Sequence, residues 1–365
     1  MQGFFPTRRD KLRHGRFRRR SPEAPGIGKG ERKTQIKKHL FAAALLAFAL
    51  PWAAAPAWAL EATELVPVGS AVGIELDTDG VMVVGLSEVA TAEGPVSPAE
   101  RAGLQTGDVI RAVDGQATPS AAVFLTLMSS LDGGEHVLTV RRGEGELRFT
   151  VTPAQNPEGA YQMGLWLRDS VTGIGTVTFY DPNTGTFGAL GHGISDTGTG
   201  ELLPFATGSI TGAEVVDVIR GAPGSPGELC GEFDRERVLG ALNKNTEQGI
   251  FGVASMEGAG AALPVAGEDE VTLGPAIIRS CVDGGGVREY DVEISRVYRN
   301  ASDSRFLLLT VTDPALLAAT GGIVQGMSGS PIIQNGKLIG AVTHVLISDP
   351  AKGYGISIEK MLEAA

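Results

Sequence analysis

Cysteine and histidine are both scarce in this sequence of 365 residues. It contains two cysteines, Cys230 and Cys281, and five histidines. Two cysteines allow at most one disulfide, which an extracytoplasmic location would permit; two buried free thiols are the alternative. No Cys/His spacing is typical of a zinc site, and no glycine-rich phosphate loop is present. We therefore expect neither a disulfide scaffold, nor a metal centre, nor a bound cofactor.

Basic residues are sparse beyond the N-terminal region. Residues 1–38 carry 13 of the 31 Lys and Arg but only 3 of the 42 Asp and Glu, so the remainder is strongly acidic. An acidic body without a basic stripe argues against a nucleic-acid surface. The basic arm leads instead into residues 40–60, which carry no charge.

This uncharged stretch indicates a targeting segment. Its core has the length of a signal-peptide apolar region, and Ala57-Trp58-Ala59 offers a small-x-small cleavage site. Pro51 and Pro56 weaken an uninterrupted membrane helix without excluding an anchor. Residues 1–60 are thus predicted to form a basic region with a signal peptide or a membrane anchor, and the acidic body to lie outside the cytoplasm.

Glycine is abundant, and its distribution predicts the fold class. The 51 glycines are about twice the usual share, and they are dispersed among residues that favour strands. The segments 176–190 and 331–343 each read as two strands joined by a tight turn, the second turn being Asn335-Gly336. We expect a mainly β protein.

The segment 67–153 resembles a PDZ domain. The run SPAERAGLQTGDVIRAVDGQ combines a short helix, with Pro98 at its first position and Gly103 at its end, with a following strand. PDZ domains bind an extended peptide as an added strand. The resemblance implies a carboxylate-binding loop at Ser70-Ala71-Val72-Gly73, with Ile74 starting the receiving strand. Peptides are therefore expected partners.

We expect the catalytic residues in the segment 164–365, with the nucleophile in the run Gly326-Met327-Ser328-Gly329-Ser330-Pro331. Glycines let the backbone fold around a serine, so that its amide and one two residues earlier converge on an oxyanion. The run resembles Gly-Asp-Ser-Gly-Gly-Pro of trypsin-like peptidases, which consist of two β-barrels. It predicts Ser328 as the nucleophile, with the amides of Gly326 and Ser328 as oxyanion donors. Ser330 is the rival nucleophile.

A serine nucleophile needs a base, and few histidines can supply it. His14 and His39 lie in the N-terminal region 1–60, and His136 lies in the PDZ-like segment. His192 stands between two glycines at the end of a predicted hairpin and is the better candidate. His344 follows on the strand after Thr343 and is the second choice.

A carboxylate should orient the imidazole. The order His, Asp, Ser limits the choice to residues 193–327, where Asp196, Asp303 and Asp313 are candidates. Asp313 follows an apolar strand and precedes Pro314, so it could equally cap a short helix. The sequence pattern alone does not determine which of these three aspartates orients the histidine.

Longer runs resemble the SpoIVB peptidase family (stage IV sporulation protein B). These are LRDSVTGIGTVTFYDPNTGTFGALGHGI, ATGGIVQGMSGSPIIQNGKLIGAVTHV and DPAKGYGISIEKML, together with DTDGVMVVG at the PDZ start. The resemblance implies a catalytic serine at Ser328, a histidine at His192 and an aspartate at Asp313. It also implies a supporting role for Thr343.

The resemblance further implies a serine endopeptidase of sporulation signalling, exported into the space between the forespore membranes. Such an enzyme would cleave itself and a regulatory membrane protein, the A subunit of the stage IV sporulation protein F complex, and thereby activate sigma-K. Two other functions are compatible with the residues. One is a noncatalytic PDZ adaptor on a degenerate peptidase scaffold. The other is a quality-control protease of the HtrA type, although those proteins usually carry PDZ domains after the peptidase.

Overall fold

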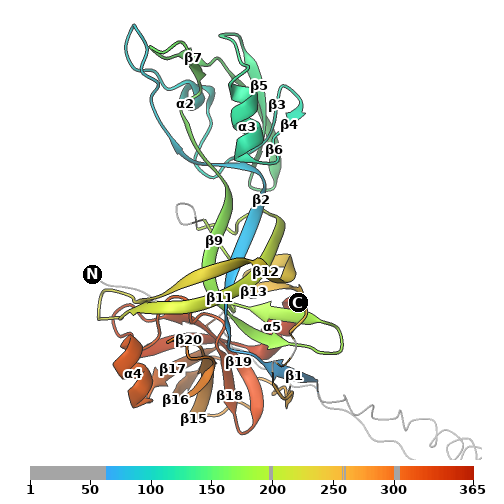
Figure 1. Cartoon of the computed structure of the whole chain (residues 1–365), viewed down its shortest axis with the longest axis vertical. Helices are drawn as coiled ribbons and strands as arrows, with labels where there is room; N and C mark the ends of the chain where they lie inside the picture. Colours follow the sequence, from blue (N-terminus) through green and yellow to red (C-terminus); the bar gives the residue numbers. More distant parts are fainter. Residues whose placement is uncertain (1–62, 197–199, 257, 259, 300–304) are drawn as a thin grey trace, which may run out of the picture. The chain divides into compact units, whose positions relative to one another are not determined.

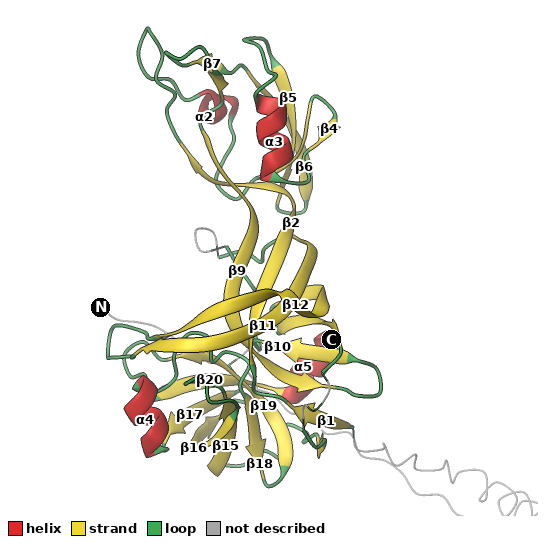
Figure 2. Cartoon of the chain, in the orientation of Figure 1, coloured by secondary structure: helices red, strands yellow, loops and turns green. Residues whose placement is uncertain are grey.

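The computed structural model describes residues 63–196, 200–256, 258, 260–299 and 305–365. The predicted signal peptide or anchor, residues 1–60, lies outside this part. Within the described residues, no helix has both the length and the apolar character needed to cross a membrane. Residues 62–365 form one compact unit, and most of its ordered backbone is strand (Figure 2), as the glycine-rich, strand-forming composition predicts.

Six strands close into a ring that we call the first barrel. They pair in the order β2-β9-β10-β13-β12-β11, and β11 returns to β2. Their bounds are β2 Ala71–Leu86, β9 Leu165–Tyr180, β10 Thr186–Ala189, β11 Phe205–Ile219, β12 Glu228–Thr246 and β13 Gly249–Ala254. The short strands β1 (Glu64–Pro67) and β14 (Leu263–Pro264) extend the sheet beside β9. Buried side chains such as Val72, Val177 and Phe187 fill the interior.

A second closed barrel follows, with strand order β15-β16-β17-β20-β19-β18 (Figure 1). Its bounds are β15 Gly274–Ser280, β16 Arg288–Val297, β17 Leu307–Val311, β18 Pro331–Gln334, β19 Lys337–Val345 and β20 Lys352–Ser357. Helix α4 (Pro314–Thr320) follows β17, and helix α5 (Ile358–Ala364) ends the chain. Strand β17 shows the period of two, because Leu307, Leu309 and Val311 are buried and the residues between them are less so.

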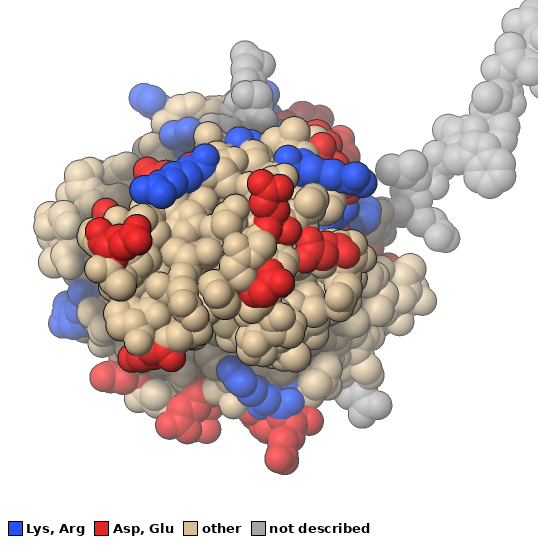
Figure 3. Space-filling view, turned by 90° about the horizontal axis from the view of Figure 1, so that it is seen from above, with Lys and Arg blue, Asp and Glu red and all other residues tan. Residues whose placement is uncertain are grey.

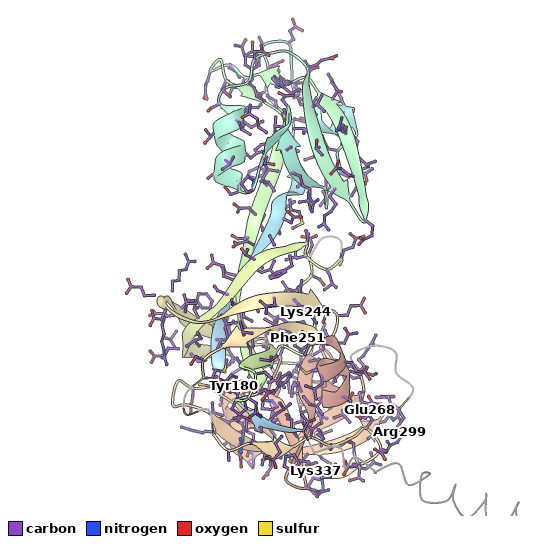
Figure 4. The ribbon with its side chains drawn as sticks, turned by 90° about the vertical axis from the view of Figure 1, so that its right-hand side faces the viewer. Tyr180, Lys244, Phe251, Glu268, Arg299 and Lys337 are labelled. Atoms are coloured by element: carbon purple, nitrogen blue, oxygen red, sulfur yellow. The ribbon has the colours of Figure 1, made fainter. Side chains whose placement is uncertain are left out.

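The two barrels share a buried apolar cluster. Phe179 and Phe251 of the first barrel pack with Ile356 of the second and with Met361 of α5. In addition, Lys244 Nζ of β12 donates hydrogen bonds to the carbonyl oxygens of the last two residues, at 3.2 and 2.6 Å. Figure 4 shows Lys244 and Phe251 on this side of the molecule. The C-terminal helix therefore fastens one barrel to the other.

Between the long strands β2 and β9 the chain forms a small lobe, residues 81–168 (Figure 1). Its elements are α2 Pro98–Ala102, β3 Val109–Val113, β4 Gln116–Ala117, α3 Ala121–Met128, β5 His136–Arg142, β6 Gly145–Val151, β7 Ala154–Gln155 and β8 Tyr161–Gln162. Gly103 ends α2 in the left-handed conformation, φ +92°, as predicted. The lobe has its own core, to which Val83, Ile110, Phe124 and Leu138 contribute.

Charged side chains of both signs are interspersed on the face shown in Figure 3. A partly buried ion pair joins Arg142 to Asp108 within the lobe. Asp108 is 1% exposed, and its two carboxylate oxygens accept from Arg142 at 2.6 and 2.8 Å. This bidentate geometry is the form of ion pair that offsets desolvation best.

The lobe is inserted within the first barrel rather than placed before it. Residues Ala71–Asp77, the first half of β2, pair with β9 and β11 of that barrel, whereas the second half pairs with β3 of the lobe. Strand β9 starts in the lobe and ends in the barrel. The boundary predicted at residue 67 therefore does not separate two domains, because single sixteen-residue strands serve both.

Candidate active site

The predicted nucleophile lies in a tight turn before β18. Gly326 and Gly329 both have positive φ, +94° and +98°, which only glycine adopts without strain. A Cβ on Gly329 would lie 2.0 Å from the carbonyl oxygen of Thr176 on β9. The glycines on either side of Ser328 are thus required by backbone conformation, and at Gly329 also by close packing of the turn against the first barrel.

Ser328 and its rival Ser330 have different surroundings. Ser328 lines a cavity of about 470 Å³, and its Oγ donates a hydrogen bond to the carbonyl oxygen of Thr343 at 2.7 Å. Ser330 is fully buried, and its hydroxyl donates to Ser280 Oγ at 3.1 Å. Of these two serines, Ser328 is therefore the one that a substrate in the cavity can reach.

His192 reaches the same cavity from the first barrel. It follows β10 after two residues in the left-handed conformation, Leu190 with φ 68° and Gly191 with φ 67°. Left-handed conformation is unusual for leucine and costs about 1–3 kcal/mol. Here the amide of Leu190 donates to the carbonyl oxygen of Thr176 at 3.2 Å. The turn that presents His192 is thus held on the same residue of β9 as the serine turn.

The hydrogen bonding of His192 leaves one ring nitrogen available as a base. Its Nδ1 lies 2.9 Å from the carbonyl oxygen of Gly193. Because a carbonyl oxygen only accepts, Nδ1 carries the proton in this bond, and Nε2 of the neutral ring is unprotonated. Burial lowers the pKa of His192 below its ordinary value, against a smaller opposite effect of the Gly193 bond. The imidazole is therefore neutral at pH 7.

The second imidazole is close by. The ring centroids of His192 and His344 are 4.9 Å apart, and both residues line the cavity. His344 is exposed at the end of β19, whereas the neighbouring Thr343 is 1% exposed. The hydroxyl of Thr343 is buried and has no hydrogen-bond partner among the described residues. Thr343 thus contributes its carbonyl to Ser328 and keeps a spare hydroxyl at the cavity wall.

The two amides predicted as oxyanion donors make no hydrogen bond to a described backbone carbonyl. Among the described residues, no backbone carbonyl accepts from the amides of Gly326 or Ser328. The carbonyl oxygens of the same two residues accept from Thr176, from Oγ1 at 2.7 Å and from the amide at 3.0 Å. The turn is therefore fixed from one side, while two amide donors stay available for a developing negative charge.

Asp313 does not orient His192 in the structure. It caps α4: its Oδ1 accepts from the amides of Ala315 and Leu316 at 2.8 and 2.9 Å, and its Oδ2 accepts from the amide of Asp291 at 3.4 Å. A carboxylate before Pro314 at a helix start satisfies amides that otherwise lack acceptors. The assignment of Asp313 as the partner of the histidine is therefore corrected, and the capping alternative holds.

The other two carboxylate candidates do not replace it. Asp303 lies outside the described residues. Asp196 is 8% exposed and lines a different cavity, together with Arg141 and Glu144 of the lobe. Within the described part of the chain, the hydrogen bond of the His192 ring goes to Gly193 rather than to a carboxylate.

We expect Asp313→Asn to separate the two roles. Asparagine caps helices about as well as aspartate, so the unfolding free energy should change by less than about 1 kcal/mol and kcat by no more than about threefold. An aspartate that orients a catalytic histidine costs about 10⁴-fold in kcat when changed to asparagine. Steady-state kinetics and urea unfolding measure both quantities, and a loss of that size would restore Asp313 to the catalytic group.

Two positioning residues were not predicted from the sequence. Thr176, described above, connects the serine turn to the histidine turn. Asn245 of β12 holds the segment after His192: its Oδ1 accepts from the amide of Ile194 at 2.9 Å, and its Nδ2 donates to the carbonyl oxygens of Ile194 and Leu203 at 2.9 and 3.2 Å. Both lie in strands with no local motif, so only the pairing of distant segments reveals them.

The predicted peptide-receiving strand is also corrected. Ala71, Val72, Gly73 and Ile74 lie in the half of β2 that belongs to the first barrel. They pair with β9 on one side, and Val72, Gly73 and Ile74 pair with β11 on the other. A strand already paired on both edges cannot accept a third. In the lobe, the edge next to α3 belongs to β9, where Asp169 Oδ2 accepts from the amide of Ala121 at 2.8 Å.

In the part of the chain that the structure describes, no group of three or more His, Cys, Asp or Glu side chains is arranged to hold a metal ion. Cys230 and Cys281 are both free thiols and both partly exposed. The cavity thus offers two serines, Ser195 and Ser328, together with two imidazoles and backbone amides.

Comparison with known proteins matches both parts of the chain to families. The model of the SpoIVB peptidase S55 family matches residues 159–362, and that of a PDZ domain matches residues 89–142. A search of curated proteins found no match. Among solved structures, the PDZ domain of an SdrC-like protein from Listeria monocytogenes is 25% identical, with a TM-score of 0.20, covering 24% of this chain and 87% of that one. The active form of the Rv3671c protease from M. tuberculosis is 15% identical, with a TM-score of 0.29, covering 54% of this chain and 73% of that one.

Proposed function

This chain belongs to the SpoIVB peptidase S55 family and is a serine peptidase with a PDZ domain, and we propose that Ser328 is its nucleophile and His192 its general base. The observation that carries this assignment is that the two residues, from different barrels, line one cavity. The two-barrel arrangement further supports a trypsin-like architecture.

In the proposed mechanism, His192 Nε2 takes the proton of Ser328 as Oγ attacks the substrate carbonyl carbon. For this step the hydroxyl turns from the carbonyl oxygen of Thr343, which it contacts at rest, toward the imidazole. The amides of Gly326 and Ser328 stabilise the oxyanion. His192 then gives the proton to the leaving amine, and a water molecule, deprotonated by the same nitrogen, hydrolyses the acyl-enzyme.

The carbonyl oxygen of Gly193 takes the part that a carboxylate has in a triad. It selects the Nδ1-protonated tautomer and holds the ring plane, and it accepts a stronger hydrogen bond once the ring is charged. It carries no full charge, so it stabilises the imidazolium less than an aspartate would.

For the biological role we propose a signalling endopeptidase of sporulation. Its substrates would be the chain itself and a regulatory membrane protein, the A subunit of the stage IV sporulation protein F complex, whose cleavage leads to activation of sigma-K. The basic N-terminal region followed by an uncharged segment supports export across the cytoplasmic membrane, with the body in the forespore intermembrane space and the uncharged segment serving as a signal peptide or a membrane anchor. The family membership supports this role, and the PDZ lobe suits peptide binding.

A serine-directed phosphonate tests the assignment. Incubated with the full chain, a peptidyl diphenyl phosphonate should form one covalent adduct, located at Ser328 by peptide mass spectrometry. The matched control is Ser330→Ala, which keeps the neighbouring serine turn and should be labelled equally. A folded chain that binds peptides but shows no adduct at Ser328 would instead support the noncatalytic adaptor.

A further inference from the structure

Strand β9 has one edge without a partner over most of its length. One edge of β9 pairs with β2 along Leu165–Thr176. The opposite edge pairs with β10, and only at the C-terminal end of the strand, at Val177, Phe179 and Tyr180. Between residues 165 and 174 no described strand occupies that second edge. None of these ten residues is buried. An edge of this kind presents unpaired N–H and C=O groups that can accept another strand.

The two ends of this free edge lie at the two functional parts of the molecule. The edge starts in the lobe, where Asp169 is bonded to the first residue of α3. It ends at the active site, where Gly173 and Ile174 line the cavity and the Thr176 amide donates to the carbonyl oxygen of Ser328. One uninterrupted strand therefore leads from the peptide-binding lobe to the nucleophile.

We propose that the C-terminal tail of the substrate adds to this edge as a single extended strand, so that the PDZ lobe and the catalytic serine hold the same stretch of polypeptide. The proposal rests on the proposed catalytic role of Ser328. The receiving strand begins at Leu165, directly after Gly164 with φ +75°. A peptide antiparallel to β9 would place its terminal carboxylate there and its upstream residues toward Ile174.

This arrangement measures the distance from the C-terminus to the scissile bond. Leu165 and Ile174 are nine residues apart, about 30 Å at the usual rise of about 3.3 Å per residue. The bound tail has the same rise, so the bond cleaved at Ser328 should lie about 9–11 residues from the substrate's C-terminus.

The side chains beside the edge indicate what kind of tail fits. Trp166 is 65% exposed, although it is a large aromatic residue, and it lies beside the start of the edge. Val171 and Ile174, at the other end, belong to the cavity wall. A neighbouring strand would cover these side chains through cross-strand contacts. The expected substrate is an extended tail rich in β-branched or apolar residues and free of proline, which lacks the required N–H.

Hydrogen exchange tests strand addition without requiring catalysis. The probe is a peptide of about 20 residues made of repeating Ala-Thr-Val-Ser units, with a lysine at the N-terminus and a free carboxylate, added to the full-length Ser328→Ala chain. Only alternate amides face one edge, so about half of the amides in residues 165–174 should gain protection, while those of β13 should not change. Binding without protection there, or no binding at all, would overturn the proposal.

Cleavage positions provide the second readout. Versions of about 16, 20 and 24 residues contain many equivalent bonds, and the wild-type chain should cut all three at the same count from the C-terminus, as mass spectrometry can show. A C-terminal amide, or a proline about five residues from the end, should lower kcat/KM at least about tenfold. Cleavage at a constant distance from the N-terminus, or at positions with no constant distance from either end, would refute the proposed fixed spacing between the C-terminus and the scissile bond. A failure of the proposed catalytic role has a different signature, namely protected β9 amides without any cleavage or phosphonate adduct.

Discussion

Replacing Ser328 by alanine is expected to lower kcat by about 10⁴- to 10⁶-fold, the range seen when the nucleophile of a serine peptidase is removed. The substitution takes away only the Oγ atom and its hydrogen bond to the Thr343 carbonyl. Because that bond lies at the cavity wall, the unfolding free energy should change by no more than about 1 kcal/mol. Peptide hydrolysis and urea unfolding of the same preparation measure the two effects.

Ser330→Ala is the matched control for this substitution. Ser330 lies two residues away, and its hydroxyl is buried against Ser280 rather than exposed to the cavity. Its loss leaves Ser280 with one partner fewer, which should cost about 1–3 kcal/mol of stability while kcat stays within about threefold. If Ser330→Ala were inactive and Ser328→Ala active, the assignment of the nucleophile would be reversed.

Replacing His192 by alanine is expected to have an effect of similar size, about 10⁴- to 10⁶-fold in kcat, since the serine and its base act as one unit. His344→Gln removes the second imidazole of the cavity and should cost about tenfold or less. An equal loss in both variants would mean that the two rings share the proton transfer. A larger loss for His344→Gln would make that residue the base.

The pH dependence of the wild-type enzyme provides an independent check on His192. Only the neutral ring accepts a proton, so kcat/KM should rise with pH through the pKa of His192 in the free enzyme. Burial lowers this pKa, and the acidic limb should therefore lie below the ordinary histidine value of about 6.5. An acidic limb centred clearly above 6.5 would indicate a carboxylate close to the ring, and would contradict the Gly193 carbonyl as its only support.

Several features could be predicted from local sequence because their causes are local. Gly326 and Gly329 are needed for backbone conformations that other residues avoid, so the glycines around Ser328 marked the turn. The scarcity of histidine reduced the choice of a base to His192 and His344. Alternation and glycine-rich turns indicated mainly β structure, and Pro98 with Gly103 indicated the short helix of the lobe.

Asp313 shows where such reasoning stops. In the sequence, an aspartate before a proline looks the same whether its side chain caps a helix or orients a histidine. The difference lies in which amides and rings the fold brings within about 3 Å. The same limit applies to Ala71–Ile74, whose strand has two partners, β9 and β11, that are distant in sequence.

The sequence by itself thus determined the class of fold, the serine turn and the small set of residues that could be its base, because these depend on backbone conformation and on composition. Only the tertiary structure decided that Ser328 rather than Ser330 is accessible, that Asp313 caps α4, and that the PDZ lobe is inserted between β2 and β9. These outcomes depend on barrel closure and strand register, which are set by pairings between residues far apart in the sequence, such as Val72 with Gly212 and Glu64 with Pro264. Local propensity does not encode such pairings.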